Sequence, residues 1–371
     1  MRIGILAPPW LPVPPRAYGG TEAVIDTLAR GLVRAGHQVT LWATGDSTCG
    51  VTRLGPDRPA VGFAHPDAAA FEAAWVRDGL EALTDCDVIH DHTTLAGALR
   101  TVTGAGRSGP PLVVTNHGVF HPHLQARFAA GGHDALVAIS VAHARTAGVR
   151  VDAVIHHGLD LERYPVGAGR GGYLAFLGRM APEKGAHRAI RVARAVGLPL
   201  RIAAKMVTPD EHRYFEVAVA PHLGDGVEFL GEIGFTAKVE LLADALALVN
   251  PIRWAEPFGL VMAEALACGT PVLALGYGAA GEIVDHGRTG YLAATTGELT
   301  RYVARLDRLD RAACRASVEV RFSATRMVRD HLRLYRRLHR ATGHRAVPTG
   351  PSRYPVPAPR EAAVGARSPV G

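Results

Sequence analysis

Residues 245–275 constrain the fold more than any other stretch, because they combine a strand, a loop, a helix and a second strand. The apolar runs at 245–249 and 272–275 each have the length of a buried strand. Between them lies a segment of helical length that ends near Gly269. Parallel α/β sheets are assembled from such units, so this stretch predicts an α/β fold.

The loop of this unit carries groups suited to a phosphorylated ligand. Glu256 and Gly259 lie where the helix begins, and unpaired N–H groups at a helix start bind anions. Glu264 follows Glu256 by about two helical turns, so a second carboxylate lies further along. A phosphorylated sugar with a ribose attached needs these partners. A helix cap plus a solvated acidic residue is the simpler interpretation, and two glutamates alone favour it.

The beginning of the chain has the same design. Residues 3–7 and 39–43 are expected strands, and Thr21 is expected to cap the helix between them. Gly19 and Gly20 would let the backbone approach a ligand at this helix start, although a tight turn explains them as well. The GxGxxG fingerprint of dinucleotide-binding domains is absent here.

Two further strands, 87–92 and 112–118, each run into a polar tip. Ligand residues collect at such tips in open α/β sheets, so we expect His90, His92 and His117 to face one crevice. A metal site is rejected because no third ligand follows from the sequence. For each histidine a structural hydrogen-bonding role is the alternative, and we favour a functional role only for His117.

A second Rossmann-like unit begins with the strand expected at 173–178, after a polar, Gly-rich linker near 163–171. The turn that follows this strand carries Arg179 and Lys184 at a helix start, which suits two adjacent phosphates. We therefore expect domains at 1–165 and 166–322, and a final helix at 323–340. Residues 341–371 are expected to be a disordered tail.

The composition narrows the class of protein. The 371 residues carry a net charge of +7, and many arginines crowd the final helix. A solvated helix face explains this charge better than nucleic acid does, and a weak peripheral contact with an anionic membrane stays open. No apolar run is long enough to span a bilayer, and the four cysteines lack zinc spacing. We expect a cytoplasmic protein, with its oligomeric state open.

Six motifs together resemble the family 4 retaining glycosyltransferases of the GT-B fold, over about residues 1–340. They are YGGTE at 18–22, RAGHQVTL at 34–41, GRMAPEKG at 178–185, EPFGLVMAEAL at 256–266, GTPV at 269–272 and GRTG at 287–290. The Pro-rich first loop is also similar to that of the small antibiotic-sugar transferases of this family, such as the avilamycin enzyme.

The resemblance implies two Rossmann-like domains facing across a cleft, with the final helix crossing back to the first domain. It implies transfer of a sugar from a nucleotide-diphosphate sugar, a UDP-sugar or one with another base, to a small-molecule, glycan or lipid acceptor. No metal or other cofactor is expected.

The resemblance also assigns roles by position. Arg179 and Lys184 would hold the donor diphosphate, Glu264 would accept the ribose hydroxyls, and Glu256 and His117 would lie at the donor sugar. The backbone around the donor would be supplied by Gly19, Gly20, Gly178, Phe258, Gly259, Leu260 and Val261. Leu230 and Ile233 are weaker candidates for the base pocket.

The acceptor is expected on the first domain, around residues 8–18, 90–94 and 117–123. Two alternatives stay open: a nucleotide-sugar epimerase of the same architecture, and a non-catalytic nucleotide-sugar-binding protein.

Overall fold

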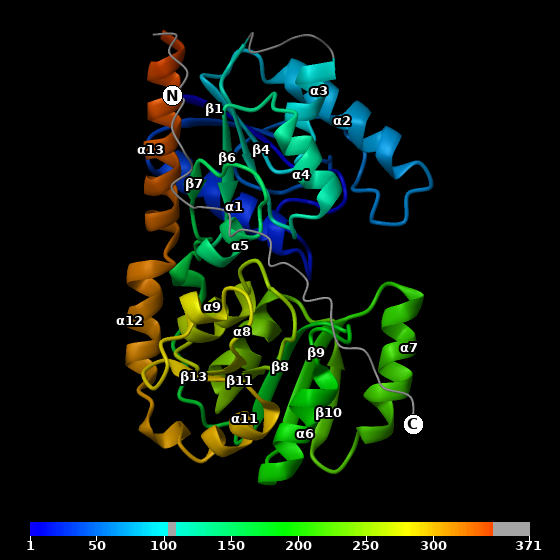
Figure 1. Ribbon diagram of the computed structural model, residues 1–371, viewed down its shortest axis with the longest axis vertical. Coiled ribbons are helices and arrows are strands. Elements are labelled where there is room, and N and C mark those ends of the chain that lie inside the picture. The colour runs from blue at the N-terminus through cyan, green and yellow to red at the C-terminus, as the bar shows by residue number, and fades with distance from the viewer. Residues whose placement is uncertain (103–108, 344–371) are drawn as a thin grey trace, which may run out of the picture.

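The chain forms two α/β halves, one above the other, in a computed structural model that describes residues 1–102 and 109–343 (Figure 1). Within these residues the strands form two parallel sheets of seven and six strands, in the orders β3-β2-β1-β4-β5-β6-β7 and β10-β9-β8-β11-β12-β13. The strands of the first sheet are β1 (Arg2–Leu6), β2 (Gln38–Trp42), β3 (Thr52–Leu54), β4 (Val88–Asp91), β5 (Leu112–Thr115), β6 (Ala135–Ala138) and β7 (Ala153–Val154). Those of the second are β8 (Leu174–Arg179), β9 (Leu200–Lys205), β10 (Val227–Gly231), β11 (Ala247–Asn250), β12 (Val272–Leu275) and β13 (Gly290–Ala293).

The central strands are short and buried along their whole length, as in β4, β5, β6, β11 and β12. Such strands need cover on both faces, and helices supply it. The helices of the first half are α1 (Gly20–Arg34), α2 (Ala68–Ala82), α3 (Ala96–Val102), α4 (Pro122–Ala129) and α5 (Val141–Arg145). The second half has α6 (Ala186–Val196), α7 (Pro209–Ala218), α8 (Phe235–Asp244), α9 (Leu260–Ala267), α10 (Ala280–Ile283), α11 (Thr296–Val303) and α12 (Arg311–Arg321), and α13 (Ala324–Gly343) ends the described chain.

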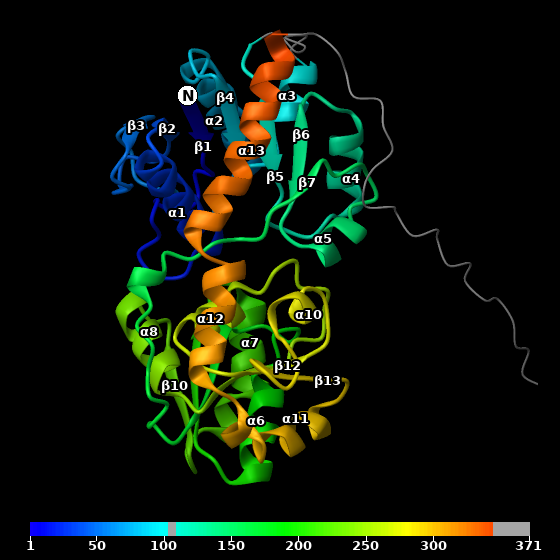
Figure 2. The same cartoon turned by 90° about the vertical axis from the view of Figure 1, so that its left-hand side faces the viewer.

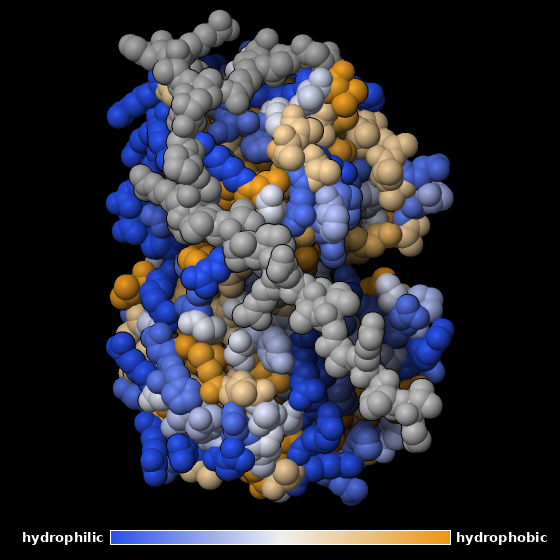
Figure 3. All heavy atoms as spheres, in the orientation of Figure 1, coloured by the Kyte–Doolittle hydropathy of each residue, from blue (hydrophilic) through white to orange (hydrophobic). Residues whose placement is uncertain are grey.

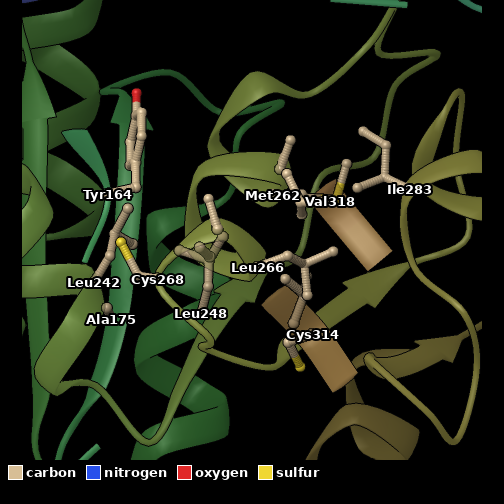
Figure 4. Close-up of a cluster of buried hydrophobic side chains, with 14 of the residues drawn as sticks. Tyr164, Ala175, Leu242, Leu248, Met262, Leu266, Cys268, Ile283, Cys314 and Val318 are labelled. Carbon is tan, nitrogen blue, oxygen red and sulfur yellow. The ribbon is translucent and has the colours of Figure 1, made fainter. Parts of the chain in front are cut away.

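The core of the second half is built around α9. Met262 and Leu266 of this helix lie in one buried cluster with Cys314 and Val318 of α12 (Figure 4). These four side chains are almost completely buried, which fixes the position of α9 and therefore of the loop in front of it.

The order of the strands predicts where a ligand binds. In each sheet the strand order reverses beside the first strand, between β1 and β4 and between β8 and β11. Ligands of open α/β sheets lie beyond the carboxyl ends of the strands at such a switch point. The two halves place these ends on either side of one cleft.

The last helix returns to the first half. In Figure 2, α13 runs upward beside the first sheet, and its Val328 and Tyr335 belong to the core cluster of that half. The contact with α1 is close at Gly31, where a Cβ atom would lie 2.6 Å from Val328 Cγ2. The expected crossing of the final helix is therefore present.

Several sequence-based expectations need correction. Helix α1 begins at Gly20 with Gly19 as its N-cap and no side-chain cap bond, so the expected cap by Thr21 is wrong. The final helix continues to Gly343, so the expected tail cannot begin at 341; residues 344–371 lie outside the described part.

Five α-helices of the described chain were not anticipated: α3, α4, α5, α7 and α10. The first three are no longer than eight residues, too short for a clear helical period. Helix α7 did carry a signal, because Thr208 and Glu211 form a capping box with Pro209 at the first helical position.

Among the residues that the structure describes, no helix is long and apolar enough to cross a membrane.

Candidate active site

A cleft of about 740 Å³ lies between the two halves. Its walls come from the loops after β1, β4 and β5 on one side and, on the other, from the end of β9 and the loops after β8, β10 and β11. Figure 3 shows the molecule indented between its upper and lower halves on the right-hand side of the view. A pocket of this size between two domains is a usual place for a small-molecule ligand.

Cationic side chains reach the cleft from the turn after β8. Arg179 is the last residue of this strand, and its guanidinium donates to Glu183 Oε1 at 2.6 Å and to Glu211 Oε1 at 3.3 Å. Lys184 lies just before α6, and its Nζ is 2.6 Å from Glu256 Oε2. Both cations are therefore already paired with carboxylates. An anionic ligand would have to replace these carboxylates or bind beside them.

The loop before α9 contributes backbone groups. Gly259 is the N-cap of α9 with φ of 91°, a left-handed conformation that favours glycine. Residues 258–261 all line the cleft. The first N–H groups of a helix have no acceptor within it, so this start offers donors and the positive end of the helix dipole to a ligand.

Glu264 lies one turn into α9 and is only 3% exposed. Its Oε1 accepts a hydrogen bond from the Tyr164 hydroxyl at 2.9 Å and also pairs with Lys238 Nζ. Burial and the neighbouring carboxylate raise the pKa of Tyr164 far above its usual value, so this residue stays a hydrogen-bond donor. In Figure 4 the Tyr164 hydroxyl points away from the packed side chains Leu242 and Cys268.

Histidines form a stacked group at the first half of the cleft. His92 Nδ1 and His117 Nε2 are 2.8 Å apart, and the rings of His117 and His157 stack at 5.1 Å. Burial lowers the pKa of His117 to about 3 and that of His92 well below its usual value, so both rings are neutral near pH 7. Within the described part of the chain, His117 Nδ1 and His92 Nε2 have no hydrogen-bond partner.

His90 does not share this position, contrary to expectation. It is fully buried and bonded to the hydroxyls of Thr115 and Tyr335 at 2.7 Å and 2.6 Å. His90 and His92 are two residues apart and share one face, with ring centres 4.1 Å apart, but His90 lies within β4 whereas His92 follows its last residue. Its role is structural, linking β4 to α13.

Direct bonds hold the two halves together beside the cleft. The Glu282 carboxylate of α10 accepts from the backbone N–H groups of Val141 and Ala142 at 2.8 and 2.7 Å. Ser140 Oγ donates to the Pro257 carbonyl at 2.6 Å, and Tyr18 N donates to Glu232 Oε1 at 3.0 Å. The loop before α9 is thus tied to the first half of the molecule.

The cleft brings together all the donor and catalytic positions proposed from the sequence. They are Gly19, Gly20, His117, Gly178, Arg179, Lys184, Glu256, Phe258, Gly259, Leu260, Val261 and Glu264. Both base-pocket candidates pack against the core of the second half, but of the two only Ile233 lines the cleft. His121 and His123 do not line it.

Sequence reasoning missed the partners of these residues. Tyr164, Lys238 and His157 line the cleft, but no local motif marks them. Their positions depend on how segments distant in sequence pack, and Tyr164 and Glu264 are 100 residues apart.

Two family comparisons divide the chain near the passage between its halves. Residues 18–163 match Glycosyltransferase Family 4, and residues 168–312 match Glycosyl transferases group 1. The chain belongs to the family 4 glycosyltransferases. With the two parallel sheets and the cleft between them, its architecture is GT-B.

This transferase is similar along nearly its whole length to AviGT4, a glycosyltransferase involved in avilamycin A biosynthesis. The likeness covers 92% of this chain and 98% of that structure, with 27% identity and a TM-score of 0.67. HepE of Anabaena in complex with UDP-glucose shares the fold, at 19% identity and a TM-score of 0.69 over 91% of this chain and 100% of that one.

A curated relative, glycogen synthase of Mycobacterium tuberculosis, is 36% identical over 152 residues. That match covers 38% of this chain and 36% of the relative, so the two share only about a third of the relative's length.

Proposed function

We propose that this glycosyltransferase moves a sugar from a nucleotide-diphosphate sugar to a hydroxyl group of an acceptor, with retention of configuration at the anomeric carbon. The observation that carries the proposal is the convergence of Arg179, Lys184 and the start of α9 on one cleft. This is a set of donors matched to a diphosphate, and it lies at the switch points of both sheets.

In this proposal the donor diphosphate lies between the Arg179 guanidinium, the Lys184 ammonium and the amides of residues 259–261. Glu264, held by Tyr164 and Lys238, accepts hydrogen bonds from the ribose hydroxyls. The base lies toward Ile233. Lys184 has to exchange Glu256 for phosphate, which releases the Glu256 carboxylate to accept hydrogen bonds from the sugar hydroxyls.

The chemical step breaks the bond between the anomeric carbon and the diphosphate oxygen and forms a bond from that carbon to the acceptor oxygen. The acceptor proton passes to the departing diphosphate. Arg179 and Lys184 neutralise the charge that develops on the leaving oxygens, so this route uses side chains and amides rather than a metal ion. His117 is neutral and can hydrogen-bond the donor sugar without adding charge.

A uridine diphosphate sugar is the first donor to test, because HepE, which has the same fold, was solved with UDP-glucose. The epimerase and non-catalytic alternatives are not favoured, since the family matches are to glycosyltransferases over both halves.

The lysines allow a direct test. The sequence contains three lysines, Lys184, Lys205 and Lys238, and all three line the cleft. Reductive methylation followed by mass spectrometry therefore reports on this site, with the amine of Met1 as the reference outside it. UDP-glucose, GDP-glucose and dTDP-glucose are compared, and a donor is expected to slow labelling of Lys184 at least tenfold without changing Met1.

Turnover is measured in parallel as release of the nucleoside diphosphate. Lys184→Ala is expected to remove donor binding, and Lys184→Arg to retain part of it. Arg201→Ala, at an exposed residue paired with Glu228, serves as the control. If none of the three donors protects Lys184 and none is consumed, the proposed function is wrong.

A further inference from the structure

The first half of the cleft has an apolar wall. It comes mainly from the Pro-rich loop after β1, with additions from two later segments: Trp10, Leu11, Pro14, Pro15, Phe63 and Leu124. None of these side chains is fully buried. A wall of partly exposed rings and aliphatic groups binds the apolar body of a ligand rather than a phosphate.

The charges on this half do not suit an anionic ligand. Its lining includes the carboxylates of Glu22, Asp26, Glu72 and Asp160, and Arg163 is the lining cation of the first half among the described residues. Arg163 Nη1 lies 4.0 Å from Asp26 Oδ2, and its guanidinium lies 4.0 Å from the centre of the Phe235 ring.

Other arginines neutralise the two aspartates. Arg30 lies within 4.0 Å of both Asp26 and Asp160, and Arg34 also pairs with Asp160. Among the residues that the structure describes, neither Glu22 nor Glu72 has a cation within 4.0 Å, and Glu72 has a side-chain hydrogen bond with Trp10.

The second half contributes one cation near this wall. Lys205 Nζ lies 5.0 Å from the centre of the Tyr18 ring and 4.9 Å from that of Phe63. It is also the cation that interacts electrostatically with Glu22. Glu22 offsets part of the Lys205 charge, and the four carboxylates that line the first half outnumber the lining Arg163, which disfavours an anionic acceptor.

Glu22 differs from two other glutamates at the same helical position. Glu211 of α7 and Glu298 of α11 are also third residues of their helices, and both carboxylates bond to backbone N–H groups at the helix start. Glu22 is the third residue of α1 but accepts no hydrogen bond from another residue within the described chain. It is nevertheless only 4% exposed and lines the cleft.

The backbone N–H of Glu22 itself is the one hydrogen-bond donor to this carboxylate among the described residues, so a buried group with several acceptor sites keeps capacity for a ligand hydroxyl. The Glu22 carboxylate also lies next to the backbone of the glycine pair at the start of α1. Glu22 Oε2 lies beside Gly19, where a Cβ atom would be 3.0 Å away. Desolvation raises the pKa of Glu22 to about 7, because burial disfavours the charged carboxylate.

We propose that Glu22 accepts a hydrogen bond from the attacking hydroxyl of an uncharged acceptor, whose apolar or aromatic body lies on the wall formed by Trp10 and Phe63. This assignment rests on the proposed function, since it concerns the acceptor of the same transfer. Glu22 orients the hydroxyl, and the proton still passes to the departing diphosphate.

The test uses an aromatic sugar acceptor in three forms. The probes are 4-nitrophenyl β-glucoside, its 6-phosphate and 4-nitrophenyl β-glucuronide, each with the donor that protects Lys184. The uncharged glucoside is expected to be used at least tenfold more efficiently, in kcat/KM, than either anionic probe. Equal or better use of an anionic probe, or use of none of the three at millimolar concentration, overturns the proposal.

Glu22→Gln tests the carboxylate itself. We expect the acceptor KM to rise, or kcat to fall, at least tenfold, while donor protection of Lys184 and donor hydrolysis stay within twofold of the native protein. Glu298→Gln is the matched control, because it removes a glutamate at the same helical position outside the cleft.

A Glu22→Gln variant with native acceptor kinetics overturns the role of Glu22. Loss of donor binding in the native protein instead counts against the proposed function, so the two failures are distinguishable.

Discussion

Lys184 Nζ lies 2.6 Å from Glu256 Oε2, although 72 residues separate the two in sequence. The pair joins the turn after β8 to the loop before α9, and its side chains are 13% and 15% exposed. Trp254 Nε1 bonds to the same Glu256 oxygen, and its ring lies 5.1 Å from Lys184 Nζ. The ion pair therefore neutralises both groups where the donor diphosphate and sugar are proposed to meet.

Substituting Glu256 and substituting Lys184 should affect UDP binding and turnover differently. Glu256→Gln removes the competing carboxylate, so UDP should bind to Lys184 at least as tightly as in the native protein. Turnover should fall about 100-fold or more, because charge placed around the reacting centre is lost. Calorimetry with UDP and steady-state rates with the UDP-sugar separate the two quantities.

Lys184→Ala is the matched change and should weaken UDP binding together with turnover. It also leaves the partly buried Glu256 carboxylate without its cationic partner, and repulsion from this carboxylate should lower the affinity for UDP further. Equal losses of UDP affinity in the lysine and glutamate variants would contradict this division of roles.

The hydrogen bond from Tyr164 to Glu264 provides a second prediction. Tyr164→Phe keeps the ring and removes the donor, so the free energy of unfolding should fall by about 0.5–1.5 kcal/mol. UDP affinity should weaken several-fold, because Glu264 loses one of the two groups that orient it. Urea denaturation and calorimetry measure these effects.

Tyr302→Phe is a suitable control for that experiment. Tyr302 stacks on Tyr291 at 4.6 Å, and its hydroxyl lies outside the cleft. An unchanged UDP affinity in Tyr164→Phe would show that Tyr164 only supports the fold.

The strands and the charged turns of the site were predictable from the sequence because each depends on neighbouring residues. Apolar runs ending in polar tips indicated the parallel sheets, and the sequences around Arg179 and Glu256 each combine a strand end with a helix start. The clustering of Glu264 with Tyr164 and Lys238 was not predictable, since it depends on how α8 and α9 pack.

The same distinction explains the histidines. The sequence placed His90 and His92 at one strand tip, but β4 ends at Asp91, so His90 lies inside the sheet under Tyr335 of α13 and His92 lies at the cleft. The cover over His90 comes from α13, 245 residues away in sequence, so the separate roles of the two histidines did not follow from the local sequence.

The buried histidines predict how stability depends on pH. Burial lowers the pKa of His331 to about 4, below the ordinary value near 6.5, so the unfolded chain binds a proton that the folded protein does not. The free energy of unfolding should be constant with respect to this group above pH 6.5 and fall as the pH decreases from 6.5 toward 4. The slope from one such group is at most about 1.4 kcal/mol per pH unit.

Urea denaturation at pH 5.0, 6.0 and 7.5 measures this slope. His331→Gln should reduce it, because one of the buried groups is removed; Nδ1 of His331 bonds to the Met327 carbonyl at 2.9 Å, so some stability is lost at every pH. His121→Gln changes an exposed histidine and controls for the substitution itself. An unchanged slope in His331→Gln would contradict the assignment of a neutral buried ring.

The contact of α1 with α13 gives the last prediction. Gly31→Ala should raise the helix propensity of α1 by up to about 1 kcal/mol, yet its new Cβ would lie 2.6 Å from Val328 Cγ2. Overpacking of this kind typically costs about 1–3 kcal/mol, so we expect net destabilisation.

Val328→Ala alone should also destabilise, because it removes two buried methyl groups. In the double variant the alanine at 31 no longer meets the valine, so the two losses should not add, and the coupling in a double-mutant cycle should be at least about 1 kcal/mol. Additive losses measured by urea denaturation would mean that α1 and α13 move apart to accept the methyl group, and that the final helix is held to the first half by its other contacts.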